Sequence, residues 1–362
     1  MSKKILIILT GGTICSFANE NGEQQSDTNK AKTLIVSKFR NGDSEFKAEK
    51  YVKFETKRPI DILSENMTIR HLNTFLSQIK RYNFSRYDGV IILHGTDTLA
   101  YTSSLLSILL AGIKIPVFMV SSQLPLYEDM ANGNDNFKTA VEHIVKGIKP
   151  NVYVPYRNDD LVDNKIVSTM YIHYGSHLLQ CQGNSNNFYS EDMKPLKSGE
   201  FFEGTQANTD DMLLYKCAKL KNCVLKIDPY VGIDYSRISL KGVKVVLHHT
   251  YHSGTMSVNP YNKSPQPEME QNIDYSKDSI MYLKKRIDAS KTHTELYIEP
   301  CDREKTYLYE TTGIVLRSGV GTSFRTTSEM AYVKLLTGCA LGYFGQQLQA
   351  FIDTEINGEF IR

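Results

Sequence analysis

Short, wholly apolar runs followed by polar turns organise the first half of the chain. Ile5–Leu9 and Val90–Leu93 contain no polar residue, and an apolar run without alternation is typical of a strand buried on both faces of a parallel sheet. After the second run, apolar residues from Leu99 to Leu110 recur at helical spacing. The pattern therefore predicts a strand followed by a helix, which is the repeating unit of an open α/β sheet.

The same reasoning extends this pattern to about residue 180. Further strands and helices are predicted within Ile60–Ser64, Ile69–Ile79, Ile115–Ser121, Asn134–Lys146 and Val152–Pro155. The order of these elements predicts a doubly wound, mostly parallel sheet. Ser64 would end its strand or cap the following helix, and both roles can hold together.

One polar segment interrupts the pattern directly after the first strand. Ser16–Lys32 contains a glycine, many polar residues and no periodicity, which is typical of a mobile surface loop. A long loop beside the end of a strand often acts as a lid over a site. We therefore expect a hairpin-like lid next to the first turn.

A second polar stretch, Asn184–Asp211, divides the chain. It has no apolar period, as expected of a linker between domains. Beyond it, strands and helices are again predicted, at Val224–Ile227, Val243–Leu247, Ser279–Arg286, Glu295–Ile298 and Ser328–Leu341. We predict a larger N-terminal α/β domain over residues 1–190, a linker over 191–220 and a smaller C-terminal α/β domain over 221–362.

Composition and charge limit the functions to consider. The 362 residues, 41% of them hydrophobic, suffice for two cores. The net charge of +2 gives no reason to expect nucleic acid or an acidic membrane surface as a partner. Met1–Lys4 leads straight into the first strand, and no apolar stretch is long enough for a signal peptide or a membrane span. We expect a cytoplasmic protein whose partner is a small molecule.

Cofactor and metal signals are weak in this sequence. No G-x-G-x-x-G or G-x-x-x-x-G-K-[ST] motif follows a predicted strand, so no nucleotide cofactor is expected. The six cysteines include no C-x-x-C pair, which favours reduced, packed thiols. His248, His249 and His252 form a cluster, but no carboxylate is interleaved, so a structural contact is favoured over a metal site. We predict no cofactor and no metal.

Two turns carry the candidate chemistry. Thr13 follows two glycines after the first strand, and Gly95, Thr96 and Asp97 follow Val90–Leu93. Because parallel strands end at one edge of a sheet, these residues should meet where α/β proteins bind ligands. Hydrolysis of an amide needs a nucleophile and donors for an oxyanion. Thr13 offers a hydroxyl beside free backbone N–H groups, and Thr96 offers a second hydroxyl. Asp97 offers a carboxylate suited to holding a substrate ammonium.

The sequence around these turns resembles the bacterial L-asparaginase/glutaminase family. TGGTI at residues 10–14 and DGVIILHGTDTLAYT at 88–102 match the two signature motifs of that family, in the same order and at the same separation. The similarity continues through IPVFMVSSQLP at 115–125 and, more weakly, through Ser328–Leu336. The resemblance implies a two-domain α/β fold, hydrolysis of a side-chain amide by a threonine nucleophile with release of ammonia, and a homodimer or homotetramer.

The resemblance also implies roles for individual residues. Ser64 matches the serine that holds a substrate α-carboxylate, and Glu65 falls where relatives have glutamine or another polar group. Two positions depart from the family pattern, because Glu23 stands in place of the lid tyrosine and Thr169 in place of a catalytic lysine. Lys165 is the nearest cation that could replace that lysine. The candidate catalytic set is thus Thr13, Thr96, Asp97 and Lys165, with substrate contacts from Ser64, Glu65, Gly95 and Glu23.

These departures leave three interpretations open. The chain is an asparaginase-like amidohydrolase for which free asparagine is a poor substrate, because Glu23 adds negative charge near a substrate carboxylate. Alternatively, it is a catalytically weakened homologue that binds an amino acid or amide, or an amidase for a modified or peptide-borne Asn or Gln. A purely structural role, in which the threonines only cap turns and helices, ranks below these.

Overall fold

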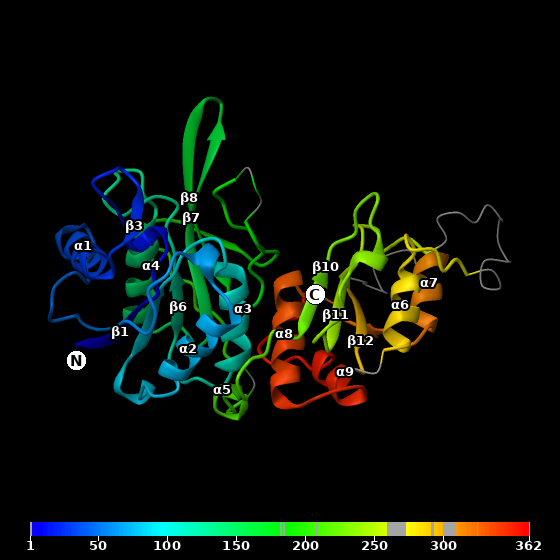
Figure 1. Cartoon of the computed structure of the whole chain (residues 1–362). Helices are drawn as coiled ribbons and strands as arrows, with labels where there is room; N and C mark the ends of the chain where they lie inside the picture. Colours follow the sequence, from blue (N-terminus) through cyan, green and yellow to red (C-terminus); the bar gives the residue numbers. More distant parts are fainter. Residues whose placement is uncertain are drawn as a thin grey trace. The chain divides into compact units, whose positions relative to one another are not determined.

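The chain folds into two compact units, shown in Figure 1. The computed structural model describes residues 2–181, 183, 185–207, 209–258, 273–290, 293–299, 309–323 and 325–361. Unit 1 comprises residues 1–217 and 356–359, and unit 2 comprises residues 218–355 and 360–362. Most of the segment predicted as a linker therefore belongs to unit 1, because residues 194–196 form a strand of its sheet.

Unit 1 is built on a seven-stranded sheet with the order β4-β1-β5-β6-β7-β8-β9. The first five strands in this order are parallel, and β8 and β9 are antiparallel to their neighbours. The strands are β1 (Lys3–Leu9), β4 (Val52–Lys57), β5 (Gly89–Leu93), β6 (Val117–Val120), β7 (Val152–Val162), β8 (Lys165–Tyr174) and β9 (Lys194–Leu196). The predicted doubly wound, mostly parallel sheet is confirmed.

Helices cover both faces of this sheet. α1 (Thr28–Asn41) and α4 (Gly133–Lys146) pack on one face, and α2 (Ile69–Ile79) and α3 (Leu99–Leu109) lie on the other (Figure 1); α5 (Leu213–Lys216) is a single turn near the end of the unit. Side chains of a strand alternate between faces, so Ile5, Ile7 and Leu9 join the core under α1 and α4. Burial on both faces explains why β1 and β5 show no polar alternation.

The segment after β1 is more regular than its composition predicts. β2 (Ser16–Ala18) and β3 (Gln24–Ser26) form an antiparallel hairpin, and the side chain of Asp27 caps the start of α1. The predicted surface loop over Ser16–Lys32 therefore contains a hairpin, and its last residues, 28–32, already belong to α1. Each strand of this hairpin has three residues, which is too short for an apolar alternation to show in the sequence.

The strand predicted to end at Ser64 is also wrong. β4 ends at Lys57, and Ser64 opens a short 3-10 helix. The side chain of Thr68, and not that of Ser64, caps α2. Within the predicted strand, Ile62 forms a single parallel bridge with Gly11.

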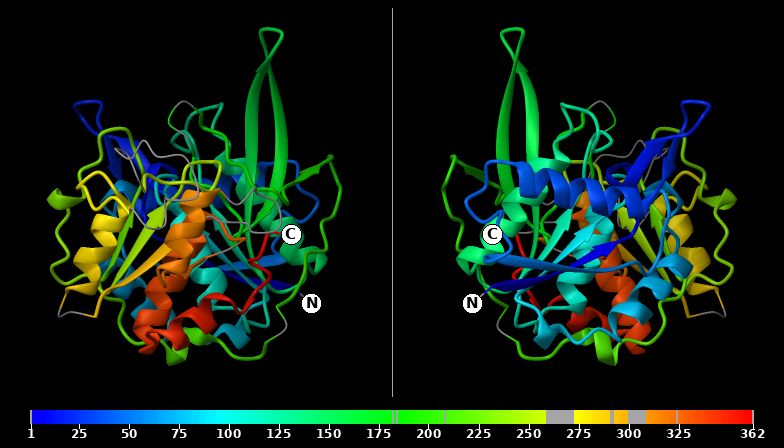
Figure 2. Two further views of the ribbon diagram at one scale, coloured as in Figure 1. Left: turned by 90° about the vertical axis from the view of Figure 1, so that its right-hand side faces the viewer. Right: turned by 90° about the vertical axis from the view of Figure 1, so that its left-hand side faces the viewer.

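β7 and β8 form a long hairpin, here called the β7–β8 arm, that extends beyond the neighbouring strands of unit 1 (Figure 2). β7 pairs with β6 through Val152 and Tyr153, whereas its pairing with β8 continues as far as Val162 and Lys165. The tip turns at Asp163 and Asn164, with φ of 49° and 58°. Two consecutive positive φ values are typical of a type I′ hairpin turn.

Unit 2 contains a four-stranded parallel sheet with the order β10-β11-β12-β13. Its strands are β10 (Val224–Ile227), β11 (Val245–His249), β12 (Glu295–Glu299) and β13 (Gly321–Thr322), and its helices are α6 (Ile280–Asp288), α7 (Glu310–Arg317), α8 (Ser328–Leu341) and α9 (Gln346–Ile352). α6 and α7 share a core with Val246 and Ile298, and α8 packs against β10 and β11. The elements predicted for this half are all present. Within the described part of the chain, every helix is too short or too polar to traverse a bilayer.

Candidate active site

The connections of unit 1 create a switch point between β1 and β5. The chain leaves β1 toward β4 on one side and leaves β5 toward β6 on the other. The turns after these two neighbouring strands therefore diverge, and doubly wound sheets bind ligands at such a point beyond the carboxyl ends of the strands. Residues 10–13 and 94–97 occupy these two turns.

Backbone hydrogen bonds hold the two turns and a third segment together. The N–H and Oγ1 of Thr10 both donate to the carbonyl oxygen of Leu93, at 3.1 and 2.9 Å. The N–H of Ile62 donates to the carbonyl oxygen of Thr10 at 3.0 Å, and the N–H of Gly12 donates to the carbonyl oxygen of Ile62 at 2.8 Å. Three segments that are far apart in the sequence thus meet at the carboxyl edge of the sheet.

Two glycines allow the turns to touch. Gly12 has a φ of 81°, and a Cβ atom at this position would lie 2.3 Å from the Cα of Gly95. A Cβ atom on Gly95 would lie 2.4 Å from the Oγ of Ser64. Only residues without a side chain fit such a close approach. The backbone therefore carries Thr13 and Thr96, which follow the two glycines and are partly exposed, in neighbouring turns.

Ser64 orients the Asp97 carboxylate. Its hydroxyl donates to Oδ2 of Asp97 at 2.6 Å, and the backbone N–H of Asp97 donates back to Oγ of Ser64 at 3.2 Å. Ser64 is buried, whereas Asp97 is exposed. From a third segment, Nε2 of Gln180 donates to the carbonyl oxygen of Asp97 at 2.5 Å. A buried hydroxyl thus fixes a carboxylate that remains accessible to a ligand.

The two predicted glutamate contacts have different surroundings. Glu65 follows Ser64 in the 3-10 helix and is exposed. Glu23 lies in the turn between β2 and β3, where its carboxylate accepts a bond from Nδ2 of Asn19 at 3.1 Å and its N–H donates to Oδ1 of Asn19 at 2.9 Å. The Glu23 carboxylate therefore accepts a hydrogen bond within the hairpin turn itself.

Lys165 makes none of the contacts described above. It begins β8 at the tip of the β7–β8 arm, where it is exposed and pairs with Val162. Thr169, at the position of the lysine that the resemblance implies, pairs with Asn158 nearer the base of the arm. Four residues of extended chain span about 13 Å. Lys165 as the replacement for that lysine stays a prediction.

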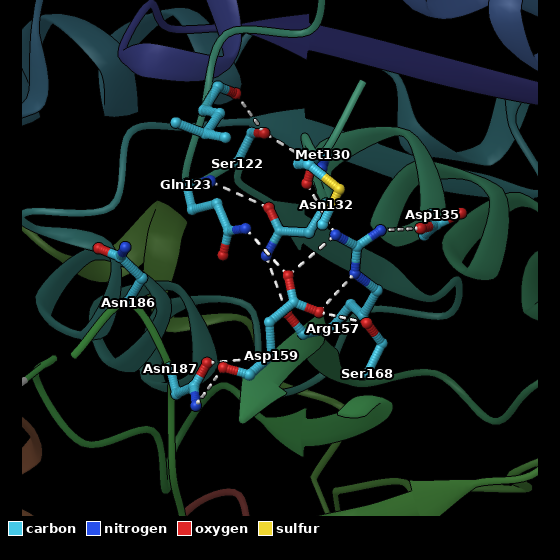
Figure 3. Close-up of polar contacts among 12 residues, drawn as sticks. Ser122, Gln123, Met130, Asn132, Asp135, Arg157, Asp159, Ser168, Asn186 and Asn187 are labelled. Atoms are coloured by element: carbon cyan, nitrogen blue, oxygen red, sulfur yellow. Dashed lines mark hydrogen bonds and ion pairs between the residues drawn. The ribbon is translucent and has the colours of Figure 1, made fainter. Parts of the chain in front are cut away.

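A polar network that the sequence analysis missed lies beside the end of β6 (Figure 3). Nε and Nη2 of Arg157 donate to the two carboxylate oxygens of Asp159 at 3.0 and 2.9 Å, and Nη1 pairs with Asp135. Nε2 of Gln123 and Oγ of Ser168 also donate to Asp159, at 3.0 and 2.6 Å. The network ties the base of the β7–β8 arm to the turn after β6.

These contacts set the charge states of the network. Burial disfavours the ionised form of Asp159, but hydrogen bonds from Arg157, Ser168 and Gln123 outweigh it and hold the pKa of this carboxyl below its ordinary value. Burial likewise disfavours the charged form of Arg157, yet its two carboxylate partners raise its pKa. Gln123 lies in a segment that resembles the family, so the sequence could have marked it as a candidate site residue. The spacing of the residues does not indicate that Gln123 lies near Arg157.

His94 and His248 have structural surroundings. His94 is buried, its Nδ1 lies 2.7 Å from the carbonyl oxygen of Gly95, and burial lowers its pKa to about 4. In unit 2, Nε2 of the buried His248 lies 2.8 Å from the hydroxyl of Tyr235, and His252 is exposed. Among the residues that the structure describes, no set of three or more His, Cys, Asp or Glu side chains is arranged to hold a metal ion.

Known proteins share both the sequence of unit 1 and the whole fold. A family model described as "Asparaginase, N-terminal" matches residues 4–200. The L-asparaginase of Thermococcus kodakarensis is 32% identical over 165 residues, which are 45% of this chain and 47% of that protein. L-asparaginase 1 of Escherichia coli (strain K12) is 32% identical over 140 residues, which are 38% of this chain and 39% of that protein. The matched segment thus spans less than half the length of these curated relatives.

A solved structure extends the similarity to both units. The thermostable L-asparaginase from Thermococcus kodakarensis superposes with a TM-score of 0.72 and 21% identity, over 99% of each chain. At this identity the similarity concerns the fold alone. The family model, in contrast, matches the sequence over 197 of the 362 residues, including both threonine turns. The chain therefore belongs to the asparaginase family.

Proposed function

We propose that the chain is an amidohydrolase that cleaves the side-chain amide of a small, amino-acid-like molecule, with Thr13 as the nucleophile. The contact between Gly12 and Gly95 supports this proposal most strongly, because it joins the two threonine-bearing turns at the switch point. The bond between Ser64 and Asp97 adds an oriented carboxylate at the same place.

The proposed reaction has two halves. The Thr13 hydroxyl attacks the amide carbon, its proton passes to the leaving nitrogen, and ammonia departs from an acyl ester of Thr13. The backbone N–H of Thr13, which follows the two glycines, and the Thr96 hydroxyl stabilise the oxyanion. Water then hydrolyses the ester and releases the acid. Asp97 holds a substrate ammonium throughout.

We further propose that free asparagine is a poor substrate. Ser64 donates its single hydroxyl proton to Asp97, so this proton is not available to a substrate α-carboxylate. The exposed carboxylate of Glu65 follows in the chain and would repel such a group. The preferred substrate carries an uncharged or cationic group where asparagine has its α-carboxylate, as a peptide-borne or amidated residue does.

A second candidate function is ligand binding without turnover. It is favoured by Thr169, which stands where the resemblance implies a lysine, and by the position of Lys165 at the tip of the β7–β8 arm. A positioned proton-transfer group contributes roughly a hundredfold or more to a rate. A site that lacks one can keep its ligand affinity and lose most of its catalysis.

Ammonia release and calorimetric binding, measured on the same compounds, separate these functions. Asparagine, glutamine, asparaginamide and an asparaginyl-glycine dipeptide form the panel. The amidohydrolase proposal expects ammonia release, faster from the amidated or peptide-borne compounds than from free asparagine. Binding without ammonia release from any compound would support the second function, and efficient turnover of free asparagine would contradict the proposed preference.

We also propose a homodimer or homotetramer, on the basis of the family resemblance alone. Light scattering at micromolar concentration should give two or four times the 41.1 kDa mass of the chain. A monomer at this concentration would contradict the proposal.

A further inference from the structure

Unit 2 has its own cluster of reactive side chains at the carboxyl edge of its sheet. Asp228 follows β10, and His249 and Glu299 end β11 and β12. Because these strands are parallel, their carboxyl ends lie at one edge. Ser328, the first residue of α8, reaches the same edge from a fourth segment. The amide-hydrolysis proposal for unit 1 uses none of these residues.

Three of these side chains are hydrogen-bonded in series. Oγ of Ser328 lies 2.9 Å from Nε2 of His249, and Nδ1 of His249 lies 2.7 Å from Oδ1 of Asp228. A hydroxyl within reach of one imidazole nitrogen, with a carboxylate on the other, is the arrangement that activates a serine nucleophile. We propose that Ser328, His249 and Asp228 form a second catalytic site, a serine acyl hydrolase that acts on esters.

A buried carboxyl group lies beside the same imidazole nitrogen. Oε2 of Glu299 lies 3.2 Å from Nε2 of His249, and Glu299 is 1% exposed. Burial raises the pKa of Glu299, and also that of Glu329, in spite of Lys226 nearby. The Ser328 hydroxyl and the Glu299 carboxyl therefore both lie within hydrogen-bond distance of the same imidazole nitrogen.

The start of α8 supplies the remaining requirement, a donor for the oxyanion. α8 has 14 residues, and Oγ1 of its capping residue Thr327 accepts the N–H of Met330 at 3.2 Å. The amide N–H of Ser328 itself has no acceptor within the helix, because the first turn leaves its donors free. The positive end of the helix therefore lies beside the hydroxyl and favours a negative charge that develops there.

The proposed ester hydrolysis needs no cofactor. Oγ of Ser328 forms a bond with the ester carbonyl carbon while its proton moves to Nε2 of His249. Collapse of the tetrahedral intermediate breaks the bond to the alkoxy oxygen, which takes the proton from His249 and leaves as an alcohol. Water, deprotonated by the same nitrogen, then hydrolyses the acyl-serine. Asp228 keeps the Nδ1 proton of His249 in place throughout.

The charges around the site indicate the class of ester. The side chain of Asp228 is 72% exposed, so its carboxylate meets solvent beside the nucleophile. An ester that carries an amino group on its acyl part is attracted by this charge. Amino-acid esters are therefore preferred over neutral esters such as acetates.

Covalent labelling by a fluorophosphonate tests the site directly, because this probe reacts with activated serines. The complete chain is incubated with the probe, and the adduct is located by peptide mass spectrometry. The expected result is one adduct at Ser328, which persists in a Thr13→Ala variant and thereby excludes the unit 1 site. His249→Gln should slow labelling by roughly a hundredfold, and Asp228→Asn by less, because this carboxylate is largely exposed.

Matched controls keep the test decisive. Ser318→Ala removes a hydroxyl that donates only to a backbone carbonyl within unit 2, at 2.6 Å from Val315, and should leave the labelling unchanged. Hydrolysis of p-nitrophenyl esters of alanine and of acetate gives a second readout, in which Ser328→Ala should lose the activity and the alanine ester should react faster. An unlabelled Ser328 in folded protein, or a rate of labelling that His249→Gln leaves unchanged, would overturn the proposal.

Discussion

Replacing Arg157 by leucine should destabilise unit 1 more than any exposed ion pair could. The side chains of Arg157 and Asp159 are 15% and 12% exposed, and two hydrogen bonds join them. Removing one partner of a buried pair leaves an uncompensated charge and costs about 3–5 kcal/mol. Because some exposure remains on both sides, we expect the lower end of this range, about 3 kcal/mol.

The other contacts of Arg157 change this estimate little. Asp135 is 49% exposed, and a pair with so exposed a partner contributes about 0–1 kcal/mol. For a unit of this size, 1 kcal/mol corresponds to a shift in Tm of about 2–4 °C. Arg157→Leu should therefore lower the Tm of unit 1 by about 6–12 °C.

Circular dichroism melts and urea titrations measure the effect, with hydrogen exchange of peptides from β7 and β8 to assign it to unit 1. Arg237→Leu is the matched control, because Arg237 is 83% exposed beside Asp234 and should change stability by less than about 1 kcal/mol. In a double-mutant cycle with Asp159→Asn, the two changes should be clearly non-additive, because Asn leaves no buried charge. Additive effects, or a loss below about 1 kcal/mol for Arg157→Leu, would refute the reasoning.

Further predictions concern the turns and the buried groups. Gly12→Ala should abolish ligand binding or folding, because its Cβ would lie 2.3 Å from the Cα of Gly95, and circular dichroism with calorimetry distinguishes the two. Ser64→Ala should weaken ligand binding roughly tenfold by calorimetry, because Asp97 loses the charge-assisted bond that orients it. Lys165→Ala, at the tip of the β7–β8 arm, should leave turnover unchanged, and a hundredfold loss would restore its proposed role. His94 and His173 are buried with pKa values lowered from 6.5 to about 4. As the pH falls, the unfolded chain therefore binds protons at these two histidines before the folded chain does. The urea concentration at the unfolding midpoint of unit 1 should fall as the pH drops from 6.5 to 4. A midpoint that stays constant over this range would contradict the buried, neutral state of the two histidines.

Elements that are buried on both faces could be predicted from the sequence. Ile5–Leu9 and Val90–Leu93 predict β1 and β5 because a central parallel strand contains only apolar residues. Ser328–Leu341 matches α8 to the residue. The glycine turns that follow the strands could be recognised as well, since only glycine permits their close approach.

Exposed or long-range features could not be predicted in this way. The strands of the β2–β3 hairpin have three residues each, and the outer half of the β7–β8 arm is exposed, so both resemble loops in sequence. The bonds from Gln123 to Asp159 and from Ser328 to His249 join residues 36 and 79 positions apart. Such pairs depend on the order of strands in the sheet, which local periodicity does not contain.

The central claim is that the contact between the two glycine turns builds a site in which Thr13 is the nucleophile. Ammonia release from the best compound of the panel tests it most directly, with unmutated protein, Thr13→Ala and the control Thr33→Ala, whose hydroxyl donates to the carbonyl of Asn29 on the exposed side of α1. The account predicts that Thr13→Ala loses turnover by at least about a thousandfold while it still binds the compound, and that Thr33→Ala is unaffected. Undiminished ammonia release by Thr13→Ala would contradict it.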